Sequence, residues 1–247
     1  TNHDATTTGD EHASLPGGVS FADLDGFRVS PQDNSSTDVV DVEPPGIDTV
    51  NKPPDDPLVP VVPSAAPDDL AGATAANERQ RLLNVLGGAS ELNAYQYPIV
   101  GSYEAEHVII KLFDYTCPHC RQMHHHLEEV QAAAPDAIGV LPLAVPPNSS
   151  CDPLVRHTSE KHEDACALAA LSLAVWRIKP DQFHDYHHWL MTGHHAPSVP
   201  DAKAKAIEIV GESALEAQLA DPHLWQRLAI GVEVYRLAKK GIVPKLL

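Results

Sequence analysis

The clearest hydrophobic pattern in the chain is an apolar run followed at once by a helical repeat. Residues 107–113 are mostly apolar and β-branched, which is typical of a buried strand. Met123, Leu127 and Val130 then recur at a spacing that places them on one face of a helix. The pattern therefore predicts a strand, a tight turn and a helix.

A second apolar run follows this helix. Pro135 marks the end of the helical pattern, and residues 137–143 can form another buried strand. A strand, helix, strand succession implies a parallel pair with a right-handed crossover. Open sheets of this kind place their sites at the carboxyl ends of the strands, so the turn after residue 113 becomes the candidate site.

Helical patterns also flank these strands. We expect a helix over residues 76–92, with an apolar face of Leu82, Leu83 and Leu86. A helical insertion is expected over about 155–240. Together these patterns predict an α/β domain spanning 76–247.

The first 75 residues have a different composition. Residues 1–75 hold ten prolines and 14 acidic residues against Arg28 and Lys52, so they contribute −12 to the net charge of −17. Such a segment buries little core, and we expect residues 1–75 to be a disordered, acidic, proline-rich linker. The excess negative charge also argues against nucleic acid as a partner.

The sequence indicates the cellular compartment of the protein less directly. Neither a signal peptide nor an apolar run long enough to span a bilayer is visible, and the chain begins with Thr1 rather than Met. We expect a processed or truncated N-terminus, which leaves open an export signal or membrane tether before Thr1. Four cysteines, all after residue 116, favour an oxidising compartment if the second pair is bridged.

Two of these cysteines lie in the predicted turn, in the motif Cys117-Pro118-His119-Cys120. Cysteines at i and i+3 in a first helical turn point the same way, so their sulfurs can form a disulfide. Pro118 suits the first helical position because it has no N–H to leave unpaired. Unpaired N–H groups and the helix dipole favour a Cys117 thiolate, and His119, if protonated, would add to that effect.

The same spacing also occurs in half of a zinc site. A complete structural zinc site needs a second close pair of ligands, and Cys151 and Cys166 are too far apart in sequence to supply it. The surrounding strand and helix favour a redox motif.

Several features together resemble the DsbA-like thioredoxin-fold thiol:disulfide oxidoreductases of the bacterial cell envelope. They are the approach at 97–101, the strand ending Phe113-Asp114-Tyr115, the CPHC motif, the helical insertion and a late Gly241-Ile242-Val243-Pro244. The resemblance implies a thioredoxin-like fold, no cofactor, and periplasmic or other extracytoplasmic localisation.

The resemblance also implies roles for individual residues. Cys117 would be the exposed nucleophile, Cys120 the resolving cysteine, and Pro244 a cis-proline facing the pair after Val243. The implied partners are unfolded or reduced proteins and a quinone-linked membrane oxidase. Family members continue past the cis-proline into two strands and a helix, so the C-terminal strands and helix are expected to be missing from a fragment that ends at Leu247.

The four cysteines allow three pairings, and sequence cannot select among them. We favour Cys117 with Cys120, because that pair is local, and therefore Cys151 with Cys166. The second pair is then expected to be a structural disulfide, with a second redox-active or regulatory pair as the alternative.

Two other readings of the site stay open. A reductase or isomerase would use the same cysteines with a different electron flow. A non-enzymatic copper or zinc module would use the CxxC pair and nearby histidines, among which His184 and His188 share a helix face. We favour a solvated polar face and predict no metal. Lys111 and Asp114 could both reach solvent, and neither is expected to be catalytic.

Overall fold

The computed structural model describes residues 27–29, 79–239 and 241–247. Gln80–Leu247 belong to one compact unit. Most of the predicted 1–75 linker lies outside the described residues. Phe27–Val29 are the exception, because they form strand β1, which pairs with a strand of the compact unit.

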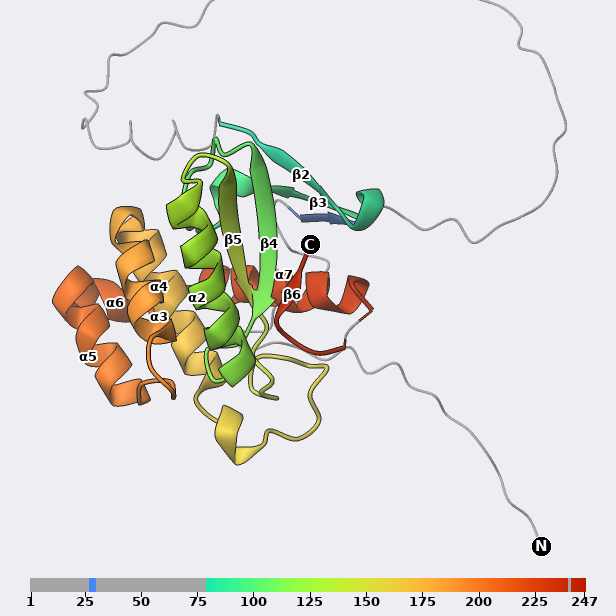
Figure 1. The fold of residues 1–247 in the computed structure, drawn as a ribbon. Coiled ribbons are helices and arrows are strands. Elements are labelled where there is room, and N and C mark those ends of the chain that lie inside the picture. Colours follow the sequence, from blue (N-terminus) through green and yellow to red (C-terminus); the bar gives the residue numbers. More distant parts are fainter. Residues whose placement is uncertain (1–26, 30–78, 240) are drawn as a thin grey trace, which may run out of the picture. The chain divides into compact units, whose positions relative to one another are not determined.

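The sheet that carries the candidate site follows the predicted order of elements (Figure 1). Strand β4 (His107–Phe113) leads into helix α2 (Pro118–Ala133), and strand β5 (Ile138–Ala144) returns parallel to β4. Strand β6 (Lys245–Leu246) pairs antiparallel with the other edge of β4, giving the order β5-β4-β6. The predicted strand, helix, strand unit is confirmed.

The helix predicted over 76–92 is wrong. This segment forms a hairpin of β2 (Leu82–Val85) and β3 (Ser90–Asn93), and the second sheet has the order β1-β3-β2. Gly87 and Gly88 have φ values of 70° and 91°, which are strained for other residues, so they turn the chain rather than end a helix. Burial alternates accordingly: Val85 and Leu92 are buried, whereas Leu82 is 51% exposed.

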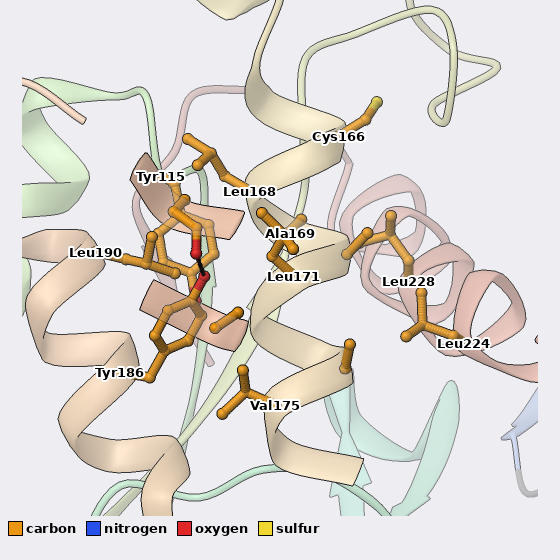
Figure 2. Packing of buried hydrophobic residues seen from close by; sticks show 14 of the residues in the cluster. Tyr115, Cys166, Leu168, Ala169, Leu171, Val175, Tyr186, Leu190, Leu224 and Leu228 are labelled. Carbon is orange, nitrogen blue, oxygen red and sulfur yellow. Dashed lines mark hydrogen bonds between the residues drawn. The ribbon is translucent and has the colours of Figure 1, made fainter. Parts of the chain in front are cut away.

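Five α-helices and two short 3-10 helices occupy the described part of the region predicted as a helical insertion. The α-helices are α3 (Ala165–Ile178), α4 (Phe183–Met191), α5 (Val199–Val210), α6 (Glu212–Leu219) and α7 (Pro222–Leu237). Figure 2 shows α3 between α4, which contributes Tyr186 and Leu190, and α7, which contributes Leu224 and Leu228. Helix α3 can be central because most of its residues are small or aliphatic and buried.

Helices cover both faces of the β4–β5 pair. Ile110 and Leu112 of β4 pack in one cluster with Ile230 and Val234 of α7. A Cβ atom on Gly231 would lie 2.3 Å from the Ala144 carbonyl oxygen, so only glycine allows α7 to approach β5 this closely. On the α2 side of the sheet, Leu127 of α2 packs with Val140 of β5 and Phe183 of α4. None of the described helices is long and apolar enough to cross a membrane.

Candidate redox active site

The two cysteines of the CPHC motif lie where β4 gives way to α2. Cys117 has extended backbone angles and is the N-cap of α2, with Pro118 at the start of the helix. The carbonyl oxygen of Cys117 accepts hydrogen bonds from the N–H groups of Cys120, at 3.1 Å, and Arg121, at 3.2 Å. The motif is therefore the first turn of the helix, with its unpaired N–H groups next to Cys117.

The two thiols have different surroundings. Both cysteines are free, but Cys117 is partly exposed whereas Cys120 is fully buried. The backbone N–H of Asp114 donates to the Cys120 sulfur at 3.4 Å. Only the first sulfur is therefore open to another molecule.

The C-terminal segment supplies the facing backbone. The Val243–Pro244 peptide bond is cis, and the Cys117 thiol lies 3.8 Å from the carbonyl oxygen of Val243. Pairing of β6 with β4 holds this segment beside the motif although 126 residues separate Cys117 from Val243. The structure thus brings Cys117 and Cys120 together with Val243 and Pro244, which the family resemblance had placed in the same site.

The site favours a negative charge on one sulfur. The hydrogen bond with the Cys120 thiol lowers the pKa of Cys117 to about 6, and backbone N–H groups of Cys120 and His119 act in the same direction against burial and Asp114. The same bond, together with burial, raises the pKa of Cys120. The exposed sulfur is therefore the better nucleophile and the better leaving group near neutral pH.

His119 helps to stabilise the Cys117 thiolate through its backbone. Its N–H is among the groups that lower the pKa of Cys117, while its side chain is exposed. The contribution expected of a protonated imidazole stays a prediction.

Two buried charges lie next to the pair, and both side chains are 1% exposed. Neither Lys111 nor Asp114 reaches solvent as the sequence analysis allowed. Burial lowers the pKa of Lys111 to about 8, and the negative charge available on Cys120 partly opposes that effect. Burial raises the pKa of Asp114, whose charge in turn raises the pKa of both cysteines. The charges of both residues therefore interact with the redox pair.

Asp114 is held by a polar network that the sequence analysis missed. Its carboxylate accepts hydrogen bonds from the N–H of Thr116, at 3.1 Å, and from the Thr116 hydroxyl, at 2.5 Å. Nδ1 of His162 lies 3.2 Å from the same carboxylate. His162 comes from the loop region before α3, and no local spacing relates it to the motif. In the sequence, the only sign of this network was the charged residue Asp114 directly after the strand.

Arg121 fixes the neighbouring helix end. Its buried guanidinium donates to the carbonyl oxygens of Tyr115 at 3.1 Å, Leu190 at 2.7 Å and His195 at 2.8 Å. It also donates to the carbonyl oxygen of Thr192. Carbonyls beyond the end of α4 would otherwise lack partners, so this cation ties the helical insertion to the first turn of α2.

The second cysteine pair lies elsewhere. Cys151 and Cys166 form a disulfide between the loop after β5 and the first turn of α3. Both residues are buried in the helical core cluster. Figure 2 shows Cys166 on α3. In the described part of the chain, no group of three or more candidate metal ligands includes Cys117 or Cys120.

The thioredoxin family model matches residues 94–138, which contain β4, the CPHC motif and α2. Combined with the β4–α2–β5 unit and the cis-proline beside the helix, this match decides the fold. The fold is thioredoxin-like. The thioredoxin-like fold predicted from the sequence is therefore confirmed.

Solved structures with a similar fold come from several bacteria. A periplasmic thioredoxin-like protein from Salmonella enterica serovar Typhimurium is 22% identical, with a TM-score of 0.46, 61% of this chain covered and 76% of that one. The thiol-disulfide exchange protein α-DsbA2 from Wolbachia pipientis is 17% identical, with a TM-score of 0.49 and coverages of 62% and 75%.

A linker-deletion variant of Proteus mirabilis ScsC is 22% identical, with a TM-score of 0.47. The match covers 61% of this chain and 63% of that structure, so less than two thirds of its length is spanned. The search of curated proteins gave no match.

Proposed function

We propose that this protein is a thiol:disulfide oxidoreductase that oxidises substrate thiols in the cell envelope through Cys117 and Cys120. One observation carries the proposal: a partly exposed cysteine at a helix N-cap, with a pKa lowered to about 6, lies beside a buried partner and a cis-proline. Thiolate character, exposure and a resolving cysteine are what disulfide exchange requires.

The reaction begins with the Cys117–Cys120 disulfide. A substrate thiolate attacks the Cys117 sulfur, forms a mixed disulfide and releases Cys120, which takes up a proton. A second substrate thiolate then attacks the substrate's own sulfur in the mixed disulfide, and Cys117 leaves as a thiolate. The substrate gains a disulfide, and two electrons pass to the cysteine pair. The backbone N–H of Asp114, which donates to the Cys120 sulfur, would stabilise the thiolate that is released.

The low pKa of Cys117 favours the oxidising direction. Stabilising the thiolate stabilises the reduced pair, which makes the disulfide form the stronger oxidant. A reductase or isomerase would use the same residues, and the reduction potential separates these activities.

The substrate would lie along the segment that precedes β6. Ile242 is 84% exposed, and Val243 offers its carbonyl oxygen beside Cys117. Pro244 has no N–H, so an extended substrate strand can pair beside it only in part. Backbone recognition of this type suits unfolded or reduced proteins, because it does not select a side chain.

Turnover also needs an electron acceptor. A quinone-linked membrane oxidase would return the pair to the disulfide form, and an extracytoplasmic location, with or without a membrane tether, would place the two proteins together. No cofactor is needed for the exchange itself, since the electrons stay on sulfur.

The test is to trap the mixed disulfide. With Cys117 first converted to its mixed disulfide with glutathione, Cys120→Ser should accumulate a covalent adduct between Cys117 and a reduced, unfolded model protein. The substrate thiolate displaces glutathione, and no resolving thiol is present to release the adduct. Cys117→Ser is the matched control and should give none. An adduct through Cys151 or Cys166, or equal adducts in both variants, would contradict the proposal.

A further inference from the structure

A second cluster of reactive side chains lies between α2 and α4, apart from the cysteines. His124 and Glu128 are one helical turn apart on α2, and His188 faces them from α4. Within the described residues, these three form the one group of potential metal ligands whose donor atoms all lie within 4.8 Å of one another.

The distances suit a single small cation. Nε2 of His124 lies 3.1 Å from Oε1 of Glu128 and 3.4 Å from Nδ1 of His188. Metal bonds of about 2.0–2.2 Å in a tetrahedral site separate their donor atoms by about 3.3 Å, so both distances fit. The Glu128–His188 contact of 2.5 Å is shorter than this spacing, so the Glu128 carboxylate must shift when an ion binds.

We propose that His124, Glu128 and His188 bind a divalent transition metal ion of the zinc type. Two imidazoles and one carboxylate are a donor set that holds zinc with one position left open. Calcium and magnesium prefer oxygen ligands, so the nitrogen donors select against them.

The two sides of the cluster are unlike each other. On the inner side, the fully buried His187 packs edge-to-face against the His124 ring, with 5.1 Å between the ring centres. On the outer side, His184 is 53% exposed, and its Nε2 lies 3.9 Å from Oε1 of Glu128. The ion therefore enters from the solvent side, where water or His184 supplies the fourth ligand.

A solvated polar face does not account for this arrangement. His124 is 2% exposed, so its imidazole is directed into the contact between the two helices. The sequence analysis placed His184 and His188 on one helix face and predicted no metal. The structure supplies that carboxylate from α2, with 60 residues between Glu128 and His188.

The site differs from a metal-binding CxxC module, and it is independent of the proposed redox function. Neither cysteine is a ligand, and the ion would connect α2 with α4. An ion that binds only the folded chain stabilises it by mass action, so zinc should raise the melting temperature.

The experiment is a zinc titration of the full chain by calorimetry, with melting curves recorded with and without zinc. The background carries Cys117→Ser and Cys120→Ser, so that no free thiol binds the metal. Glu128→Gln and His188→Ala change partly exposed ligands, and His126→Ala is the matched control, since His126 pairs with Glu129 outside the cluster.

The background and the His126→Ala variant should bind one zinc ion each and melt at a higher temperature in its presence. Glu128→Gln and His188→Ala should each weaken zinc binding by more than about tenfold and lose that rise. Melting curves without metal show whether each variant folds. No zinc binding by the background, or equal binding by all the variants, would overturn the proposal.

Discussion

The two cysteine pairs of this chain have opposite surroundings. Cys117 and Cys120 are free thiols at the start of a helix, one of them partly exposed. Cys151 and Cys166 form a buried disulfide that closes a 15-residue separation. Position therefore distinguishes them: a helix N-terminus beside an open backbone segment supports exchange, whereas a bridge inside the core supports the fold.

The surrounding polar groups reinforce this contrast. Backbone N–H groups lower the pKa of the Cys117 thiol, which also lies 3.8 Å from the carbonyl oxygen of Val243. These groups surround a sulfur that another molecule can reach. The Cys166 sulfur lies 3.8 Å from the carbonyl oxygen of Asn148 inside the core. A reagent must open the core to attack this second pair.

The largest expected effect is on activity. Cys117→Ser should reduce oxidative folding of a reduced model protein to the uncatalysed rate, because no exposed nucleophile remains. The double variant Cys151→Ser, Cys166→Ser should keep the activity of each folded molecule. The comparison fails if the second variant loses activity while its circular dichroism spectrum is unchanged.

Stability should show the reverse order. Losing the Cys151–Cys166 bridge should lower the free energy of unfolding by about 3 kcal/mol, the chain-entropy value for a loop of 15 residues. Replacing both Cys117 and Cys120 by serine should cost less, since no bridge is lost from the reduced protein. Denaturant unfolding of the two double variants measures both changes in the free energy of unfolding. Equal decreases in the two variants would contradict the assignment of one pair to stability and the other to exchange.

The pH dependence of alkylation sharpens the account of Cys117. Only the thiolate reacts, so the rate should rise with pH, reach half its maximum near pH 6, and level off well below the ordinary thiol value of 9.0. In Cys120→Ala the midpoint should move upward, because the side-chain hydrogen bond that contributes most to the lowered pKa is lost. Rates measured by mass spectrometry across the pH range test this. A midpoint unchanged by that substitution would assign the shift to the helix N-terminus instead.

The smallest expected effect comes from Asp114. Its negative charge raises the pKa of Cys117, but this effect is smaller than those of the hydrogen bonds and of burial. Asp114→Asn should therefore lower the pH midpoint of Cys117 alkylation slightly, because it removes a negative charge that raises the pKa of Cys117. Thr116→Val is the matched control, because it removes one hydrogen bond to the Asp114 carboxylate but keeps the carboxylate itself. It should lower the pH midpoint of alkylation by less than Asp114→Asn does, or not at all.

The sequence predicted the local part of this site well. Residues 107–143 carry an apolar run, a helical repeat and a second apolar run, and the structure follows that order. The hairpin of residues 82–93 was not predicted, because leucines at adjacent positions fit a helix face as well as a strand.

Contacts between distant segments account for the other omissions. His162 meets Asp114, and His188 meets Glu128, only after the helical insertion packs against α2. No spacing along the chain encodes either contact. The cis-proline segment could be located in advance only through the resemblance to a known family.

The central claim is that only one of the two pairs exchanges electrons readily. The most direct measurement is a glutathione redox titration in which mass spectrometry of thiol-labelled peptides follows both pairs in the same sample. The account predicts that Cys117–Cys120 titrates near the potential of strong oxidants, about −120 mV, while Cys151–Cys166 stays oxidised throughout. A potential near −270 mV for the first pair, or titration of both pairs together, would contradict it.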